Sequence, residues 1–176
     1  MDALLPQAYL IGLVVILTVA AVAVGRQVWR VRRDELSLAH LERQGAEQSG
    51  SAGDLYELGS AQLRKRLYGQ ASDTLKQALK KAQGTQEPSE ALALIENALG
   101  FALAAQNNYK AAIPHYRKAL QAKADYPVAL NNLAFALEKQ RKLDEAREVY
   151  EQALALDPTN KTAQKRLNLL GRRQAA

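Results

Sequence analysis

An internal repeat with a spacing of 34 residues constrains the fold of this chain more than any other feature. Its clearest part is a motif of two alanines, seven residues apart, that enclose a large apolar residue. The three copies are Ala71-x3-Leu75-x2-Ala78, Ala112-x3-Tyr116-x2-Ala119 and Ala146-x3-Tyr150-x2-Ala153. The first two copies lie 41 residues apart, and we place the seven additional residues in the turn-forming stretch 84–90. Such a period predicts one supersecondary unit per repeat, stacked into an array.

A second set of recurring residues predicts that each repeat is a helix, a tight turn and an antiparallel helix. Small residues recur in the first half of each repeat, at Gly59, Gly100 and Ala134. We expect them to let the paired helices approach and to meet the first alanine of each motif, while Leu75 and its equivalents fill the space toward the next repeat. No repeat can bury its apolar face alone, so the three must stack.

These residues resemble the tetratricopeptide repeat (TPR) family over residues 54–172. The resemblance implies an all-α solenoid of three repeats at 54–83, 93–126 and 127–160, a capping helix at 161–172 and a tail at 173–176. The chain departs from the family pattern in its first helices, which have Leu55, Glu96 and Leu130 in place of the usual tryptophan, and at Pro114. Glu96 places a carboxylate where the other repeats have leucine, and the sequence identifies no partner for it. Pro114 lies inside a second helix and predicts a mild kink.

The N-terminal region is dominated by a long apolar segment, residues 8–25, without a charged side chain. We predict a transmembrane helix over residues 3–25, which is about 34 Å long and sufficient to cross a membrane. A cleaved signal peptide is one alternative, but it carries positive charge before the apolar run, whereas here the arginines follow it. A helix buried in a protein core is the other, and the missing polar face argues against it.

The residues that follow this segment predict its orientation. Those expected at the membrane interface are Arg26, Trp29, Arg30, Arg32 and Arg33. Arginine favours the cytoplasmic side of a membrane and tryptophan favours the interface, so we expect the N-terminus outside and the repeats inside. Residues 26–53 would combine this basic exit with a short helical extension and a flexible linker of small polar residues.

The first helices of the repeats should line the inner, concave surface of the solenoid, where we expect a protein partner to bind. The candidate residues recur with the repeat and are Tyr56, Ser60, Asn97, Phe101, Asn131, Asn132, Phe135, Lys165 and Arg166. Side-chain amides beside exposed aromatic rings suit an extended peptide, because amides bond its backbone and rings hold its side chains. Two alternatives stay open: the phenylalanines are core residues between repeats, or the asparagines are simply solvated.

Other functions receive less support from the sequence. The five-residue clamp with which some TPR domains hold an acidic chaperone tail is matched only at Asn132 and Arg166. The net charge is +6, but no aromatic platform interleaves with the basic residues, which argues against nucleic acid. The chain has no cysteine, no glycine-rich phosphate loop and no zinc-type histidine pair. We therefore expect no enzyme activity, metal, cofactor or small-molecule substrate.

The order of the segments carries a closer resemblance. An N-terminal span, the exit GRQVWRVRR, a linker and LYELG at the start of the first repeat resemble the membrane-anchored TPR proteins that assist photosystem I assembly in cyanobacteria and plastids. The resemblance implies a thylakoid membrane protein with a lumenal N-terminus, a cytoplasmic or stromal TPR domain, and photosystem I subunits or an assembly intermediate as partner. A mitochondrial outer-membrane import receptor and a bacterial envelope assembly scaffold are the alternatives.

Overall fold

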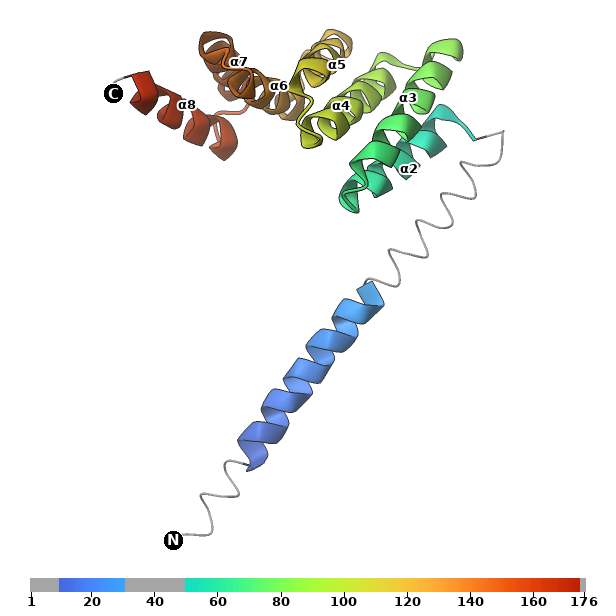
Figure 1. The fold of residues 1–176 in the computed structure, drawn as a ribbon, viewed down its shortest axis with the longest axis vertical. Helices are drawn as coiled ribbons and strands as arrows, with labels where there is room; N and C mark the ends of the chain where they lie inside the picture. Colours follow the sequence, from blue (N-terminus) through green and yellow to red (C-terminus); the bar gives the residue numbers. More distant parts are fainter. Residues whose placement is uncertain (1–9, 31–49, 175–176) are drawn as a thin grey trace. The chain divides into compact units, whose positions relative to one another are not determined.

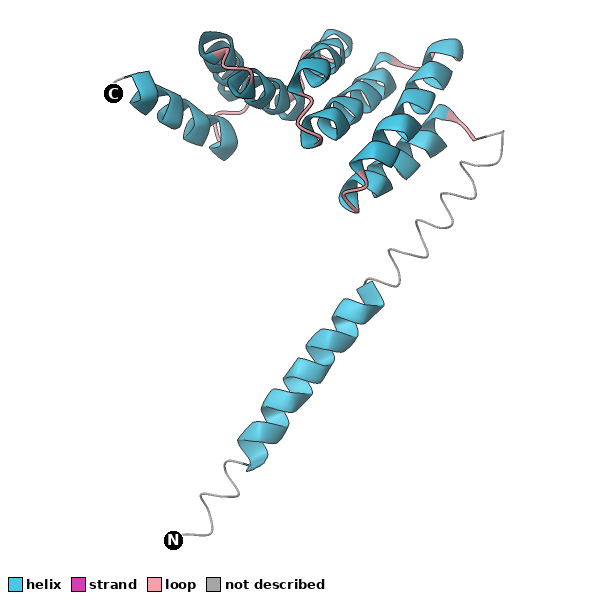
Figure 2. Ribbon diagram, in the orientation of Figure 1, coloured by secondary structure: helices cyan, strands magenta, loops and turns pink. Residues whose placement is uncertain are grey.

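The computed structural model describes residues 10–30 and 50–174, in which all regular secondary structure is helical (Figure 1, Figure 2). The chain divides into two compact parts, Met1–Glu42 and Arg43–Ala176. The predicted all-α fold class is confirmed.

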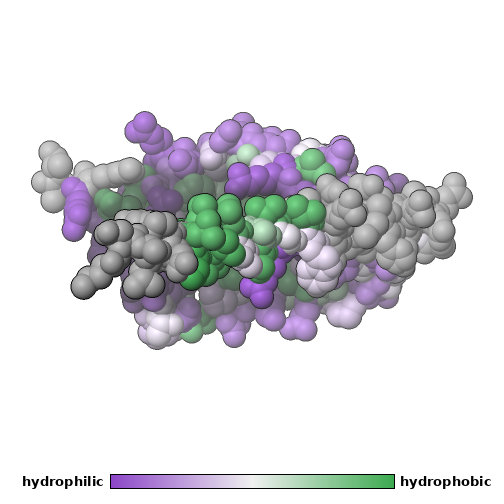
Figure 3. Space-filling view, turned by 90° about the horizontal axis from the view of Figure 1, so that it is seen from below, coloured by the Kyte–Doolittle hydropathy of each residue, from purple (hydrophilic) through white to green (hydrophobic). Residues whose placement is uncertain are grey.

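The described residues of the N-terminal part form one helix, Leu10–Arg30, of 21 residues. Its aliphatic side chains are exposed and form the apolar surface that lies between two grey stretches in Figure 3. At 1.5 Å per residue the helix is about 31 Å long, so it is long and apolar enough to cross a hydrocarbon core. The helix continues beyond Gly25, where we placed the end of the span, and residues 3–9 lie outside the described residues.

Seven helices follow in residues 50–174 (Figure 1). They are α2 (Ala52–Arg64), α3 (Tyr68–Gly84), α4 (Ser89–Ala105), α5 (Tyr109–Ala122), α6 (Pro127–Lys139), α7 (Leu143–Leu156) and α8 (Lys161–Gln174). Within the repeats, α2 pairs with α3, α4 with α5, and α6 with α7; each second helix also packs against the first helix of the next repeat, and α8 completes the series on α7. The first helices α2, α4 and α6 contact one another in turn. The predicted stack of helical hairpins is confirmed.

The turn inside each repeat has the same geometry in all three copies. The backbone N–H of Leu67, Asn108 and Lys142 donates to the carbonyl five residues earlier, at 2.9, 3.0 and 3.0 Å. This hydrogen bond closes a Schellman motif, in which the residue directly before the N–H donor adopts a left-handed conformation. That residue is Arg66, Asn107 or Arg141, with φ of 61°, 62° and 61°. Asparagine tolerates this conformation, whereas other residues with a Cβ pay about 1–2 kcal/mol.

The small residues of the first helices make room for the large residue of the motif, and our expectation about their neighbour was wrong. A Cβ on Gly100 would lie 2.7 Å from Cε1 of Tyr116, and a Cβ on Gly59 would lie 2.7 Å from Cγ of Leu75. The nearest neighbours of the two glycines are therefore these large side chains and not the alanines that we expected. Tyr116 and Leu75 are fully buried as a result, and each closes the gap to the next repeat.

The seven additional residues of the first repeat lengthen helices and do not enlarge the turn. Helix α3 has 17 residues, three more than α5 and α7, and α4 has 17, four more than α6. The connection between α3 and α4, residues 85–88, is therefore as short as that between α5 and α6, residues 123–126. Our placement of the insertion in a turn over 84–90 was wrong, because the additional residues extend α3 and α4, and Ala82 of α3 is buried in one cluster with Ala52 of α2 and Ile95 of α4.

The buried carboxylate of Glu96 finds its partner on the second helix of the same repeat. Oε2 of Glu96 lies 2.6 Å from Nδ1 of His115, and the Glu96 side chain is 5% exposed. Nζ of Lys118 lies 4.0 Å from the other carboxylate oxygen. In the third repeat the equivalent positions are Leu130 and Val149. A polar pair thus replaces an apolar contact. Helix α5 continues through the exposed Pro114 without ending.

Helix α8 has the sequence of a terminal cap. Ala163 and Leu170 are buried against the third repeat, as their equivalents Ala129 and Ala136 are against the second. On the side where α6 buries leucine and alanine against its paired helix, α8 has exposed polar residues such as Gln164 and Asn168. A polar outer face closes the stack without a further helix.

We predict that Gly100→Ala destabilises the protein by about 1–3 kcal/mol, because its methyl group overlaps the buried Tyr116 ring. Urea unfolding of the full chain in mild detergent, followed by circular dichroism, measures the change. The matched control is Gly69→Ala, since nothing lies within 4 Å of a Cβ there, and it should keep or slightly raise stability. Equal stability of Gly100→Ala and the wild type would contradict the close approach.

A second prediction concerns the pair in the middle repeat. Removal of the imidazole by His115→Ala leaves the buried Glu96 without its hydrogen bond and should cost about 2 kcal/mol. The double variant Glu96→Leu with His115→Val copies the third repeat and should recover that loss, because packed apolar residues often replace a buried polar pair without penalty. The same unfolding assay measures both variants, and a double variant less stable than His115→Ala would refute this account.

Candidate functional site

The first helices carry all of the predicted partner-binding residues, and the structure places them at different depths. Tyr56 and Ser60 are half-buried on α2; Asn97 is buried and Phe101 exposed on α4; Asn131, Asn132 and Phe135 are half-buried on α6; Lys165 is exposed and Arg166 half-buried on α8. We call the surface formed by α2, α4, α6 and α8 the first-helix face. Partner binding at this face stays a prediction.

The asparagines of the first-helix face connect repeats to one another. Nδ2 of Asn97 donates to the hydroxyl of Tyr126 at 3.2 Å, and Oδ1 of Asn97 accepts from Asn132 at 3.0 Å. One repeat further, Nδ2 of Asn131 donates to Oδ1 of Asn160 at 3.2 Å. Both Tyr126 and Asn160 lie in the turn that leaves the repeat. These amides are therefore not simply solvated, and each fixes the position of its first helix against the next.

We call this series of hydrogen bonds the asparagine ladder, and its burial determines the ionisation of Tyr126. Burial raises the pKa of the Tyr126 phenol, the nearby Tyr56 adds to the shift, and the hydrogen bond from Asn97 opposes it. The phenol is therefore neutral and stays a hydrogen-bonding group at physiological pH. Asn160 also accepts the backbone N–H of Ala163 at 3.1 Å, so one amide both caps α8 and holds α6.

An aromatic cluster with two cations occupies the first-helix face between the second and third repeats. Tyr109 meets Phe135 edge-on, with ring centroids 6.2 Å apart and an interplanar angle of 76°. Nζ of Lys139 lies 5.2 Å from the Phe135 centroid, and Cζ of Arg166 lies 4.8 Å from it. Both cations are close enough for a cation–π interaction with the ring.

Arg166 is held by a second contact, because its Nη1 lies 3.5 Å from Oε1 of Glu138. The Glu138 side chain is 8% exposed, so its carboxylate is nearly removed from solvent, whereas the Arg166 side chain is 34% exposed. Burial, followed by the nearby Glu138 carboxylate, raises the pKa of Tyr150. Arg166 is thus fixed by the ring of Phe135 and by the carboxylate together.

A pocket of about 230 Å³ opens beside this cluster. Its lining residues are Phe101, Ala104, Ala105, Asn107, Tyr109, Tyr116, Asn132 and Phe135. We call it the aromatic pocket. Phe101 is 43% exposed, so this ring is not a core residue between repeats, which was the alternative to partner binding. The volume suits one apolar side chain of a partner, with Asn132 as a polar group at its wall.

The sequence alone missed several residues of this site. Neither Tyr109 nor Lys139 was among the residues predicted to bind a partner. The repeat pattern offered a signal for Tyr109. This residue directly follows the turn after α4, and in a stack of equivalent repeats that turn lies beside the C-terminal end of the next first helix, α6. Tyr126 and Asn160 occupy equivalent positions, 34 residues apart, and could have been found by the same period.

The predicted membrane-interface residues lie partly within the described chain. Arg26, Trp29 and Arg30 belong to the last turns of the helix Leu10–Arg30, and the Trp29 side chain is 66% exposed. Arg32 and Arg33 lie outside the described residues. Within residues 10–30 and 50–174, no group of three His, Asp or Glu side chains is arranged to hold a metal ion.

Comparison with protein families and solved structures identifies the repeat type. A tetratricopeptide repeat family matches residues 127–160, and a TPR repeat family matches residues 100–141. The first TPR domain of RPAP3, solved with an HSP90 peptide, superposes with a TM-score of 0.65 at 22% identity, over 73% of this chain and 97% of that one. MamA from Desulfovibrio magneticus superposes with a TM-score of 0.71 at 21% identity, over 82% and 79%. At such identities these similarities show the fold alone.

Curated relatives cover the chain more fully. The ycf37 protein of Guillardia theta is 35% identical over 170 residues, which are 97% of this chain and 94% of that protein. The ycf37 protein of Cyanophora paradoxa is 31% identical over 82% of this chain and 83% of its own length. The chloroplastic TPR protein PYG7 of Arabidopsis thaliana is 35% identical over 92% of this chain, which spans about half of PYG7. Their identity of 31–35% over most of the chain places it in the ycf37 family of tetratricopeptide-repeat proteins.

Proposed function

We propose that this protein is a membrane-anchored scaffold that binds a protein partner on its first-helix face and assists the assembly or stabilisation of photosystem I. One observation carries the proposal: an exposed ring, Phe101, stands beside an open aromatic pocket of about 230 Å³ on that face. Large aromatic side chains at the rim of a concave, partly apolar site are typical anchors of protein interfaces.

The pocket is built to keep its shape before a partner arrives. Phe135 is held by Tyr109 and by the cations of Lys139 and Arg166, while the floor is the fully buried Tyr116. A preformed site loses little side-chain entropy on binding, which favours affinity. Lys139 and Arg166 also place positive charge next to the pocket, so a partner segment with an apolar residue beside an acidic one fits best.

The N-terminal helix supports the anchoring part of the proposal. The helix Leu10–Arg30 has the length of a membrane span, and Arg26 and Arg30 follow its apolar part. Basic residues at this end favour a lumenal N-terminus with the repeats on the cytoplasmic or stromal side. An anchor confines the scaffold to the membrane of its partner and raises the local concentration of that partner, so modest affinity suffices.

We propose photosystem I as the complex that this protein helps to assemble, because of its relatives and the order of its segments. Relatives named ycf37 and a chloroplastic TPR protein align with most of the chain, and the order of segments resembles the TPR proteins that act in photosystem I assembly. A thylakoid anchor would place the first-helix face beside incoming photosystem subunits. The proposed role is that of a binding scaffold without catalysis.

We predict that Phe101→Ala weakens capture of the partner by about 2 kcal/mol, or roughly 30-fold in Kd, because the ring is an exposed anchor. The measurement is affinity capture from detergent-solubilised thylakoid membranes, with photosystem I subunits quantified by mass spectrometry. Unfolding midpoints should change little, since the ring is largely solvated.

The matched control for this experiment is Leu156→Ala, on the second helix α7, where the side chain is 47% exposed. It removes a similar exposed apolar group outside the aromatic pocket and should leave capture unchanged. Equal losses in both variants would contradict the pocket as the binding site. Wild-type protein that recovers no photosystem I subunit would contradict the proposed partner.

The orientation gives a separate prediction. In sealed thylakoid vesicles with the stromal side outward, added protease should digest the repeats and leave a membrane-bound fragment that contains the helix Leu10–Arg30. Antibodies against an N-terminal and a C-terminal tag follow the two ends. Repeats that are digested only after the vesicles are opened would show the reverse topology.

A further inference from the structure

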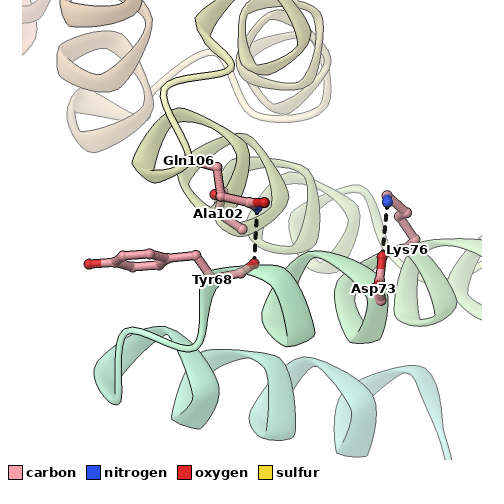
Figure 4. A network of polar contacts seen from close by, with 5 residues as sticks. All are labelled: Tyr68, Asp73, Lys76, Ala102 and Gln106. Atoms are coloured by element: carbon pink, nitrogen blue, oxygen red, sulfur yellow. Dashed lines mark hydrogen bonds and ion pairs between the residues drawn. The ribbon is translucent and has the colours of Figure 1, made fainter.

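The turns inside the three repeats follow one another along one edge of the stack. Gln106, in the turn of the second repeat, donates through Nε2 to the carbonyl of Tyr68 at 3.1 Å, and Tyr68 begins α3 directly after the turn of the first repeat (Figure 4). Tyr109, at the start of α5, contacts Phe135 near the end of α6. We call this edge the turn edge. It comprises residues 61–71, 102–112, 136–146 and 170–172.

The turn edge is strongly basic. Its eight cationic residues are Arg64, Lys65, Arg66, Lys110, Lys139, Arg141, Lys142 and Arg172, and its three acidic residues are Glu138, Asp144 and Glu145. Two of the three carboxylates are engaged, since Glu138 binds Arg166 and Glu145 binds Lys142 at 2.7 Å. Positive charge therefore predominates, and it is most concentrated in the first repeat.

The opposite edge has the reverse balance. It comprises residues 50–55, 81–92, 119–130 and 153–164, where the connections between repeats lie. Its cationic residues are Lys81, Lys123 and Lys161, and its acidic residues are Asp54, Glu87, Glu90, Asp125 and Asp157. The net charge of +6 is therefore distributed unevenly over the stack, and a uniformly charged surface for solubility alone does not account for it.

Two arginines of the turn edge occupy positions that do not favour arginine. Arg66 and Arg141 have φ of 61° in the left-handed conformation, where the equivalent residue of the second repeat is Asn107. Both side chains are exposed, and neither forms an ion pair in the described part of the chain. The ion pairs of the described residues do not use these two guanidiniums, so both are available to an external anion.

We propose that the turn edge lies against anionic lipid headgroups and sets the orientation of the stack on the membrane. The inference rests on the proposed membrane anchor. The described helix reaches Arg30 and α2 begins at Ala52, so the stack is tethered within reach of the bilayer surface, and the charge of its two edges decides which edge faces the headgroups. Clusters of Lys and Arg near a membrane-anchored segment bind anionic lipids, and each such residue raises occupancy of the surface about five-fold.

The first repeat supplies the densest contact. Arg64, Lys65 and Arg66 are consecutive, and the next residue, Leu67, is 37% exposed. A basic run beside an exposed aliphatic side chain suits the boundary between headgroups and acyl chains. With the turn edge toward the headgroups, the acidic edge would point away from them, and the aromatic pocket, which includes Asn107 and Tyr109 of the turn edge, would lie close to a partner in the same membrane.

The absence of cysteine from the chain allows a site-specific test. Gly69→Cys places a label on the turn edge, and Gly84→Cys places one on the opposite edge; both glycines are exposed, with nothing within 4 Å of a Cβ. Each full-length variant carries an environment-sensitive fluorophore and is reconstituted in nanodiscs of phosphatidylcholine or phosphatidylglycerol that contain a lipid-attached quencher. We expect the Gly69 label to be quenched in phosphatidylglycerol only, and the Gly84 label in neither lipid.

Charge variants separate electrostatic contact from general proximity. The double variant Arg64→Glu with Arg66→Glu should abolish quenching of the Gly69 label, as should raised salt, which screens exposed charges. The control, Lys80→Glu with Lys161→Glu, makes the same change in net charge outside the turn edge and should leave quenching unchanged. Equal effects of the two double variants would overturn the proposal.

The remaining outcomes distinguish this inference from the proposed function. A chain that does not co-elute with the discs refutes the anchor, and the inference with it. A chain that co-elutes but shows no quenching of the Gly69 label in phosphatidylglycerol, or equal quenching in both lipids, refutes the inference alone. Protection of that label by an added acidic protein, without an effect of lipid, would overturn it in favour of a protein contact.

Discussion

The stack depends on one kind of contact, in which a large side chain of a second helix is buried against a small residue of the first. Tyr116 fills the space left by Gly100, and Leu75 fills the space left by Gly59. A hairpin of two short helices cannot bury such a side chain alone, so the next repeat must cover it. Stability is therefore shared between neighbours, and the polar outer face of α8 is required to end the series.

The same packing creates the candidate site. Tyr116, which closes the interior of the second repeat, is also the floor of the aromatic pocket, and Phe101 lies one residue after Gly100 on α4. The asparagine ladder then fixes each first helix against its neighbour. A site built from the core of a repeat array keeps its geometry without a ligand, which is the property that a scaffold needs if it is to recognise a partner.

Two different surfaces of the stack suit two different contacts. The first-helix face combines rings, amides and two fixed cations, and is the proposed site for a protein segment. The turn edge combines exposed cations with few free carboxylates, and is the proposed contact with lipid headgroups. The two surfaces meet at Asn107, Tyr109 and Lys139, because Asn107 and Tyr109 line the aromatic pocket and the ammonium of Lys139 stands over Phe135. A stack held in this orientation would keep its pocket near the membrane surface, within reach of a membrane-embedded partner.

The sequence by itself determined the helices, their pairing and the apolar N-terminal segment, because these follow from local periodicity and from residues that recur every 34 positions. The tertiary structure decided which residues meet: His115 as the partner of Glu96, the burial of Asn97 between Tyr126 and Asn132, and the joining of Tyr109 to Phe135. It also placed the seven additional residues in α3 and α4, which are longer than the other helices of the repeats. The physical reason is that a repeat pattern assigns a residue to a face, whereas contacts between residues 19 to 35 positions apart depend on helix crossing and on which side chains fill the space between the helices.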